Sequence, residues 1–325
     1  MTQTTTAPRL IADVGGTNAR FALSTQPDAF TAVRVLACQQ FPTIADAVRH
    51  YLDGAGNPPV QDVVIAIATP VLGDEVRMTN HHWSFSIEAT RRALGLRTLL
   101  VLNDFGALAM SLPFLADTDL RRLDQHQEQR HGVKAVVGPG TGLGVAGLVP
   151  VARGWQPIAT EGGHASLAPA TPLETEILQI VWKTHAHVSA ERLISGMGLP
   201  LLYRALCSVA GTRPRPEADD AAGVVALAEA GSCATAGQTL GVFSAMLGGF
   251  AGNVALTFGA TGGLYIGGGV VGKLGRHFDV EAFRARFLAK GRFAAYLEAV
   301  PNYLIVADQP AFVGAAHQLD QHLAA

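Results

Sequence analysis

Short apolar runs alternate along the chain with longer segments in which polar and apolar residues are mixed. The runs predict β-strands over residues 10–14, 21–23, 33–37, 63–68, 98–102, 134–137, 145–149, 264–266 and 303–306. Helices are expected in most of the segments between them. The clearest helix start is at Thr171, because Pro172 fits the first helical position and Glu174 completes a capping box. This alternation of strands and helices predicts an α/β fold.

Residues 230–272 contain no charged side chain, which raises the question of a membrane-spanning helix. Such a helix needs about 20 predominantly apolar residues. Here Gln238, Ser244, Asn253 and Thr257 interrupt the run, and residues 263–269 have the pattern of a strand followed by a turn. We therefore expect a buried helix followed by a central strand, and no association with a membrane.

Composition and charge narrow the classes of partner. With 325 residues the chain is long enough for two domains, and its formal charge of −2 provides no basic field for nucleic acid, so small molecules are the expected partners. Cys38, Cys207 and Cys233 show neither CxxC nor Cys/His spacing, which argues against a disulfide framework and a structural zinc site. Residues 1–8 have no export-signal pattern, so a cytoplasmic location is expected.

A glycine-containing turn near the N-terminus has the composition of a phosphate-binding site. Asp13, Gly15, Gly16 and Thr17 lie at the tip of the hairpin predicted from the first two strands. Glycines permit positive φ and let backbone N–H groups approach an anion, while Thr17 and Asp13 supply oxygens for phosphate and metal. An ordinary hairpin turn without a ligand has the same composition.

A second hairpin of the same kind favours the phosphate-binding interpretation. The segment Gly138-Pro139-Gly140-Thr141-Gly142 lies between the strands predicted at 134–137 and 145–149. Enough sequence separates the two hairpins for a full α/β unit, which indicates two similar halves with a nucleotide phosphate chain between their turns. This arrangement resembles the actin-like ATPase and sugar kinase superfamily. Pro139 lacks an N–H group, which alters the set of donors at the second turn.

Two other phosphate-binding motifs are excluded because a residue that each motif requires is absent. Gly267 to Lys273 have Walker spacing, but Leu274 occupies the position where Ser or Thr must reach Mg²⁺. A dinucleotide-binding fingerprint that begins at Gly138 requires glycine at Leu143, and a strand follows where a helix is needed.

Polar side chains suited to a sugar occur at three places in a chain of low charge. Asn103 and Asp104 follow the run at 98–102, interpreted as a central strand whose carboxyl end faces a ligand, and Glu161, His164 and Glu191 come later. Because each sugar hydroxyl both donates and accepts, carboxylates, amides and histidine suit it. Each residue also has a structural interpretation: Asp104 as a helix cap, His164 as a structural histidine and Glu191 as a surface ion-pair partner.

Over nearly its whole length the chain resembles bacterial glucokinases of the hexokinase superfamily. The resemblance rests on these segments and their order: Asp13-Val14-Gly15-Gly16-Thr17-Asn18-Ala19-Arg20, Thr79-Asn80-His81-His82-Trp83-Ser84-Phe85-Ser86, Leu102-Asn103-Asp104-Phe105-Gly106-Ala107, Gly140-Thr141-Gly142-Leu143-Gly144, Glu161-Gly162-Gly163-His164, Glu191-Arg192-Leu193-Ile194-Ser195-Gly196, Gly267-Gly268-Gly269 and Lys290-Gly291-Arg292-Phe293. The cysteine-rich zinc motif of the related repressor and kinase group does not occur, so the chain is similar to the zinc-free branch.

The resemblance implies a duplicated actin-like ATPase fold, related to ribonuclease H, with two domains around a nucleotide and sugar cleft. A small domain would span residues 1–112 and about 303–325, and a large domain residues 113–302. The implied reaction transfers the γ-phosphate of ATP to the 6-hydroxyl of glucose, giving glucose 6-phosphate for glycolysis. The implied enzyme is a cytoplasmic homodimer that requires Mg²⁺.

The resemblance also implies a role for each motif residue. Asp104 would be the catalytic base, and the sugar hydroxyls would be held by Asn103, Glu161, His164 and Glu191. Asp13 would support Mg²⁺. The nucleotide would contact Asp13, Gly15, Gly16, Thr17, Asn18, Gly140, Thr141, Gly142, Gly267, Gly268 and Gly269, of which the last three would lie against adenosine.

Two other functions on the same fold remain as alternatives. A non-catalytic sugar-binding regulator would carry a DNA-binding module, and no helix-turn-helix pattern precedes the first hairpin. An ATP-driven assembly or chaperone protein of the actin type would leave Glu161, His164 and Glu191 without a sugar to bind.

Overall fold

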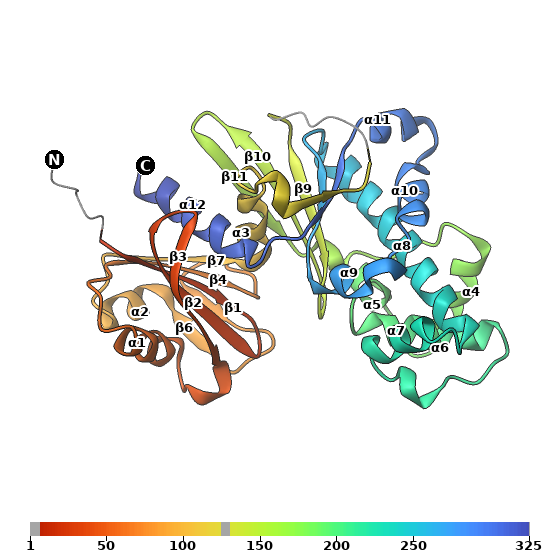
Figure 1. Cartoon of the computed structure of the whole chain (residues 1–325), viewed down its shortest axis with the longest axis horizontal. Helices are drawn as coiled ribbons and strands as arrows, with labels where there is room; N and C mark the ends of the chain where they lie inside the picture. The colour runs from red at the N-terminus through yellow and green to blue at the C-terminus, as the bar shows by residue number, and fades with distance from the viewer. Residues whose placement is uncertain (1–6, 125–130, 325) are drawn as a thin grey trace. The chain divides into compact units, whose positions relative to one another are not determined.

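The computed structural model describes residues 7–124 and 131–324. Two compact units divide the chain: unit 1 consists of Met1–Ala116, Val151–Ala159 and Ala307–Ala325, and unit 2 of Asp117–Pro150 and Thr160–Val306. Each unit has its own β-sheet and its own hydrophobic core (Figure 1).

Unit 1 is built on a five-stranded sheet with the order β3-β2-β1-β4-β7. β2 is antiparallel to both β1 and β3, whereas β4 and β7 run parallel to β1. β5 and β6 form a separate two-stranded sheet. The strands are β1 (Arg9–Val14), β2 (Asn18–Gln26), β3 (Ala29–Ala37), β4 (Asp62–Ile67), β5 (Glu75–Arg77), β6 (Ser84–Ser86) and β7 (Thr98–Asn103).

Helices cover both faces of the unit 1 sheet, because successive side chains of its strands point to opposite faces and both sets are apolar. Leu10 and Ala12 pack in a cluster with α1 and α2, while Ile11 packs in a second cluster with α3 and α12. Figure 1 shows the two pairs of helices on opposite faces. The helices are α1 (Ile44–Gly54), α2 (Ile87–Ala93), α3 (Asp104–Ser111) and α12 (Pro310–Leu323), with a 3-10 turn at Cys38–Gln40.

Unit 2 repeats this strand arrangement in a six-stranded sheet with the order β11-β10-β9-β12-β13-β8. β10 is antiparallel to β9, and β12 and β13 run parallel to β9, as β4 and β7 do to β1. The duplication predicted from the two glycine-containing hairpins is therefore present in the strand order. The strands are β8 (Leu120–Arg122), β9 (Lys134–Pro139), β10 (Leu143–Val151), β11 (Gly154–Thr160), β12 (Leu264–Ile266) and β13 (Asn302–Ile305).

The core of unit 2 lies between one face of this sheet and a group of helices that surround α8. The helices are α4 (Pro172–Val181), α5 (Ala190–Leu193), α6 (Gly198–Val209), α7 (Ala221–Glu229), α8 (Ala234–Phe258), α9 (Gly269–Leu274), α10 (Val280–Leu288) and α11 (Ala294–Glu298). The 3-10 turns of this unit are Asp117–Asp119, Gly162–His164, Pro216–Ala218, Gly275–His277 and Gly291–Phe293.

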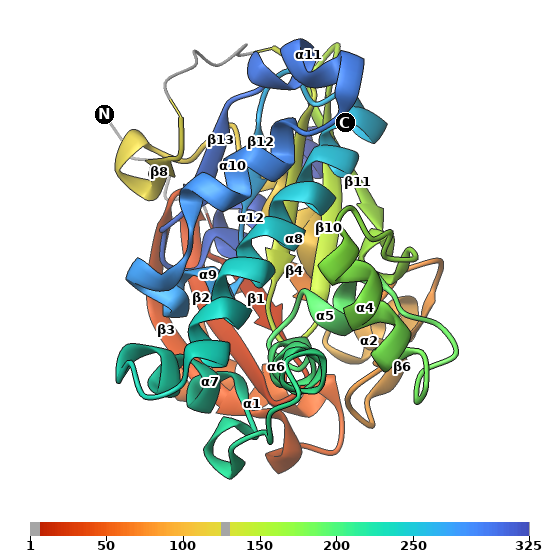
Figure 2. The ribbon, with the colours of Figure 1, turned by 90° about the vertical axis from the view of Figure 1, so that its right-hand side faces the viewer.

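α8 accounts for the uncharged region of the sequence. By length and composition it is apolar enough to cross a membrane, but 72% of its most apolar stretch is buried within the protein. α8 packs along α10 (Figure 2). A Cβ at Gly248 would lie 2.1 Å from the carbonyl oxygen of Phe283 on that helix. β12 lies between β9 and β13. The predicted buried helix and central strand are both confirmed.

The strand predictions hold because apolar runs mark strands that are covered on both faces. Every predicted strand range overlaps an observed strand. β11 was not predicted, since Gly154 and Pro157 interrupt its apolar pattern. β5, β6 and β8 each contain only one apolar residue and so give no apolar run. The predicted strand at 98–102 is β7, but β7 pairs only with β4 and lies at the edge of its sheet. Its interpretation as a central strand is therefore wrong.

The start of α4 shows one difference from the predicted capping box. The Thr171 hydroxyl accepts the N–H of Glu174 at 3.2 Å, as expected for the N-cap. The Glu174 carboxylate does not close the box on Thr171 but accepts the N–H of Ala170 at 2.7 Å and pairs with Arg286 at 2.9 Å. Glu174 is 4% exposed, and a charge that is so deeply buried needs an opposite charge beside it.

The boundaries of the units differ from those predicted. The predicted small domain resumes at about residue 303, but β13 is hydrogen-bonded between β12 and β8 in the sheet of unit 2, and unit 1 resumes at Ala307. The segment Val151–Ala159 also groups with unit 1 rather than with the large domain. This segment contains the end of β10 and most of β11, although β11 is hydrogen-bonded to β10 in the six-stranded sheet. Sequence patterns do not reveal this grouping, because it depends on tertiary contacts.

Candidate active site

The first predicted phosphate-binding turn connects β1 and β2 in unit 1. The Gly15 N–H donates to the carbonyl of Asn18 at 2.9 Å and closes the turn, so this donor is already used. Cys38 holds the turn from the side: its N–H donates to the Thr17 carbonyl at 2.9 Å and its thiol donates to the Gly15 carbonyl at 3.5 Å. Thr17 and Asn18 remain exposed at the tip. The turn is therefore a fixed loop that presents polar groups to solvent.

The second predicted turn connects β9 and β10 in unit 2 and has a similar construction. The Gly140 N–H donates to the carbonyl of Gly142 at 2.9 Å, and Thr141 is exposed at the tip. The Gly140 carbonyl accepts the N–H of Gly196 at 2.8 Å, which ties the turn to the segment between α5 and α6. In both turns the first glycine uses its N–H internally, and the hydroxyl of the threonine lies beyond it.

The glycines at 15, 16, 140 and 142 do not adopt the positive φ angles that the sequence suggested. That part of the prediction is wrong. Close approach is the reason at two of these positions: a Cβ at Gly16 would lie 3.0 Å from the Cβ of Asn80, and a Cβ at Gly142 would lie 2.3 Å from Oε2 of Glu191. A side chain at either position would displace a neighbouring polar residue.

Asp13 lies at the base of the first turn and is paired with Arg20. The two residues are cross-strand partners, and Nη1 of Arg20 is 3.2 Å from Oδ2 of Asp13. Burial raises the pKa of Asp13, and the Arg20 guanidinium opposes that rise. Among the residues that the structure describes, no group of three or more His, Cys, Asp or Glu side chains is arranged to hold a metal ion. Asp13 thus supplies a carboxylate beside a phosphate-type turn.

Asn103 and Asp104 stand where β7 ends and α3 begins. Asn103 is the N-cap of α3, since its side-chain oxygen accepts the N–H of Gly106 at 3.1 Å. Its amide nitrogen donates to Oδ1 of Asp104 at 3.1 Å and to the carbonyl of Thr69 at 3.3 Å. The Phe105 N–H donates to the same Asp104 oxygen at 2.9 Å. The alternative in which Asp104 is the helix cap is therefore wrong, and these contacts orient its carboxylate.

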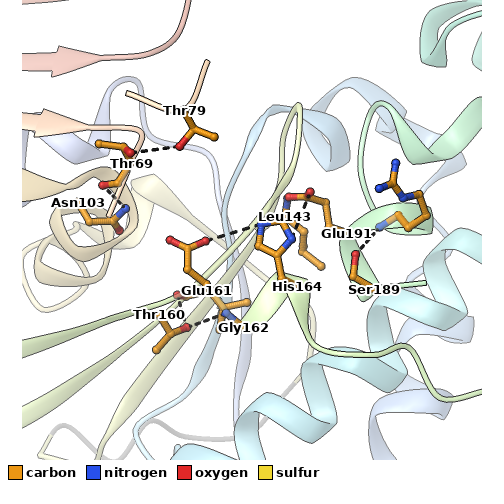
Figure 3. A network of polar contacts seen from close by, with 12 residues as sticks. Thr69, Thr79, Asn103, Leu143, Thr160, Glu161, Gly162, His164, Ser189 and Glu191 are labelled. Atoms are coloured by element: carbon orange, nitrogen blue, oxygen red, sulfur yellow. Dashed lines mark hydrogen bonds and ion pairs between the residues drawn. The ribbon is translucent and has the colours of Figure 1, made fainter. Parts of the chain in front are cut away.

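Glu161, His164 and Glu191 lie together in unit 2 (Figure 3). Nε2 of His164 is 3.8 Å from Oε2 of Glu161, and Nδ1 is 3.8 Å from Oε1 of Glu191. The exposed fractions of the side chains are 57% for Glu161, 60% for His164 and 24% for Glu191. The other carboxylate oxygen of Glu191 accepts the N–H of Leu143, the residue that follows the second turn, at 2.9 Å.

Local chain pairing explains why these residues meet although thirty positions of sequence separate them. Ser166 and Ser189 form an isolated antiparallel bridge, and the Ala190 N–H donates to the carbonyl of Ala165 at 2.9 Å. The turn Gly162–His164 is thereby fixed beside the first residues of α5. Gly163 is required there, because a Cβ would lie 1.9 Å from the Leu143 carbonyl oxygen. The structure brings together the residues that the sequence proposed for sugar hydroxyls in this unit.

A cavity of about 1080 Å³ in unit 2 begins at the second turn. Gly140 and Thr141 line one part of it, and the facing sides of α6, α7 and α9 line the rest. Its charged lining residues are Arg204, Asp219, Asp220, Glu229 and Lys273. The volume is sufficient for a nucleotide. The α6 and α7 residues could not be predicted from the sequence, because they are single positions on helix surfaces outside any motif.

The glycines at 267–269 do not share one role. A Cβ at Gly268 would lie 2.5 Å from the Pro139 carbonyl oxygen, and Gly268 has a φ of +77°. Gly267 donates its N–H to the carbonyl of Val137 at 2.8 Å. Gly269 lines the cavity, and a Cβ there would meet no heavy atom within 4 Å. The structure thus places Gly269 alone of the three on the cavity wall.

The family model for glucokinase matches residues 10–322 of the chain. The chain belongs to the glucokinase family. It is 50% identical over 317 residues to a glucokinase of Chromobacterium violaceum, covering 98% of this chain and 90% of that one. The crystal structure of a glucokinase from an Antarctic psychrotroph superposes with a TM-score of 0.88 at 36% identity, covering 97% of this chain and 99% of that one.

Other similar proteins differ in length or in sequence. The chain is 52% identical to the bifunctional protein glk of Burkholderia pseudomallei, covering 97% of this chain but only 49% of that protein, so it spans about half the length of such relatives. A glucokinase of Streptomyces griseus from the ROK family, solved with glucose and AMPPNP, has a TM-score of 0.63 at 19% identity and covers 97% of this chain and 99% of its own. These likenesses and the duplicated sheets confirm the actin-like ATPase fold predicted for the glucokinase family.

Proposed function

We propose that the chain transfers the γ-phosphate of ATP to the 6-hydroxyl of glucose. The observation that carries this proposal is the hydrogen bond from the Leu143 N–H to Glu191. This hydrogen bond places the cluster of Glu161, His164 and Glu191 directly beside the glycine-containing turn between β9 and β10, whose composition suits a phosphate. A sugar kinase needs side chains that bind sugar hydroxyls next to a turn that binds phosphate. The name of the family to which the chain belongs, glucokinase, describes the same activity.

Glu161, His164 and Glu191 supply the acceptors and donors that adjacent sugar hydroxyls require. Each hydroxyl donates to a carboxylate oxygen and accepts from a nitrogen or another donor. Because Leu143 occupies one oxygen of Glu191, the other is oriented toward His164. Asn103 is proposed as a further hydroxyl ligand, with its amide already held by its contact to Thr69.

Asp104 is proposed to accept the proton of the 6-hydroxyl. Phosphoryl transfer passes through a loose transition state, so the main requirements are alignment and neutralisation of charge, and the proton leaves late. The N–H groups of Asn103 and Phe105 bind one oxygen of Asp104 at 3.1 and 2.9 Å, which fixes the direction of the carboxylate. Asp104 therefore acts first to align the hydroxyl and then to take its proton.

We propose that the two glycine-containing turns and the cavity bind the phosphoryl donor ATP together with Mg²⁺. The cavity that begins at Gly140 and Thr141 would hold the nucleotide. In support, the Streptomyces griseus protein of the same fold was solved in complex with glucose and AMPPNP. Mg²⁺ usually binds proteins through one or two carboxylates together with water and substrate phosphates, and Asp13 fits that pattern. Bound Mg²⁺ would neutralise charge on the phosphate chain.

We also propose that the protein is a cytoplasmic homodimer. Light scattering of the purified protein would test its oligomeric state.

A coupled assay across hexoses and phosphoryl donors tests the proposal. Formation of hexose 6-phosphate from glucose and ATP is expected, with little ATP hydrolysis when no hexose is present. Glucose binding without phosphorylation would favour a non-catalytic regulator. ATP hydrolysis that is independent of hexose would favour an assembly or chaperone protein of the actin type, and transfer from polyphosphate in place of ATP would overturn the donor assignment.

Glu161→Gln is expected to weaken glucose binding by about 1.5–3 kcal/mol, the scale of a hydrogen bond to a charged group. The substitution keeps an acceptor of the same shape but removes the charge. Calorimetric titration with glucose measures the loss, and the Michaelis constant for ATP should change much less. Glu176→Gln, an exposed residue on α4, is the matched control and should leave both unchanged. A loss confined to ATP would remove Glu161 from the sugar site.

A further inference from the structure

The segment Gly267–Lys273 contains a lysine that the proposed reaction does not yet use. The P-loop interpretation of this segment fails at Leu274, but Lys273 itself lies on α9 and lines the cavity together with Gly269. Positions four residues apart occupy the same face of a helix. Gly269 and Lys273 therefore form one strip of the cavity wall.

The geometry of a helix directs the Lys273 side chain toward the second turn. In an α-helix each Cα–Cβ bond is tilted toward the N-terminus, so a long side chain extends over the preceding turn. For Lys273 that turn contains Gly269, above which a Cβ would meet no heavy atom within 4 Å. The neighbouring Gly268 lies against the Pro139 carbonyl, next to Gly140 and Thr141. The space beside Gly269 is therefore open to a long side chain that extends from Lys273.

The charge of Lys273 is not neutralised within the protein. Lys273 is exposed, and within residues 7–124 and 131–324 it has no ion-pair or hydrogen-bond partner. Two acidic residues of the cavity have partners elsewhere: Asp220 accepts the N–H of Gly223 at 2.7 Å at the start of α7, and Glu229 lies 3.7 Å from His277. An unpaired cation beside a glycine turn has the charge that a phosphate chain requires.

We propose that Lys273 binds the α- and β-phosphates of the donor nucleotide, an inference that rests on the proposed function of the cavity. The γ-phosphate belongs at the other end of the turn, where Gly142 and Leu143 adjoin Glu191. Lys273 lines the cavity together with Gly140 and Gly269, at the beginning of the turn. Its role is to hold the part of the nucleotide that remains as ADP, as a point charge on a flexible stem.

Lys273→Met tests this role, because methionine keeps an unbranched side chain and removes the charge. Binding of adenosine, ADP and a non-hydrolysable ATP analogue is measured by calorimetry in the wild type and in the variant. Affinity for ADP and for the analogue is expected to fall by about tenfold to a hundredfold, the scale of one charged hydrogen bond, while affinity for adenosine and glucose stays within about twofold. Lys273→Arg should restore part of the loss.

Arg276→Met is the matched control, since Arg276 is an exposed cation close in sequence that does not line the cavity. It should leave all affinities unchanged. Unchanged ADP affinity in Lys273→Met, or an equal loss for adenosine and ADP, would overturn the assignment of Lys273 while leaving the proposed function intact. If the wild type binds neither ADP nor the ATP analogue, the function proposed for the cavity falls and the role of Lys273 falls with it.

Discussion

Replacing Asp104 by Asn is expected to lower kcat by about 10²–10⁴ while the affinity for glucose changes little. Asparagine keeps the oxygen that accepts the Phe105 N–H at 2.9 Å, so the start of α3 should remain folded. The group that accepts the proton of the sugar hydroxyl is lost. Steady-state kinetics with glucose as the varied substrate, together with calorimetric glucose titration, separates the effect on turnover from the effect on binding.

Asp279→Asn provides a matched control for Asp104. Asp279 is the N-cap of α10, where it accepts the N–H of Ala282 at 2.8 Å, and no catalytic role is proposed for it. Its replacement should alter stability slightly and leave kcat unchanged. If Asp104→Asn behaves in the same way, with near-normal turnover, Asp104 serves only the start of its helix and another group must take the proton.

Valine at position 269 is expected to weaken ATP binding at least about tenfold and to leave both glucose affinity and stability nearly unchanged, because the new side chain enters open cavity rather than protein. Gly269 has no heavy atom within 4 Å of a Cβ position. The Michaelis constant for ATP and the glucose affinity of the same variant measure the two effects. Equal losses for both ligands, with a lower Tm, would remove Gly269 from the nucleotide site.

The neighbouring Gly268→Val should behave in the opposite way. Its φ of +77° disfavours a β-branched residue, and a Cβ would lie 2.5 Å from the Pro139 carbonyl oxygen. We expect a loss of stability of about 2–5 kcal/mol, with a Tm lower by about 5–15 °C. Thermal unfolding of the two variants under the same conditions checks the contrast, and a stable Gly268→Val protein with a selective ATP defect would reverse these assignments.

The strands and the hairpins with their turns could be predicted from the sequence because they depend on local patterns. Apolar runs mark buried strands whether a strand is central or at an edge, which is why β7 was found but misplaced. Its leucine and valine residues are covered by helices on both faces, so hydrophobicity carries no information about the number of neighbouring strands. Pairing, which makes β7 an edge strand, is a tertiary property.

The glycines also show that tertiary contacts cannot be predicted from the local sequence. Glycine in a turn suggests positive φ, yet the glycines of the two phosphate-type turns have none. Positions 16 and 142 require glycine because residues from distant parts of the chain lie against them. These residues are Asn80 beside Gly16 and Glu191 beside Gly142. Gly268 does have positive φ, and there the contact with Pro139 acts as well. The sequence shows where a glycine is, but not which distant residue lies against it.

By itself, the sequence determined the α/β class, the duplicated hairpins, the family and the residue types available for phosphate and sugar, because these follow from local periodicity and from motif order. Only the tertiary structure decided that Glu191 meets the second turn through Leu143, that Asn103 rather than Asp104 caps α3, and that Gly269 and Lys273 share a cavity wall. These contacts join residues that are far apart in sequence or depend on the direction of a side chain, and both are set by packing rather than by the local pattern.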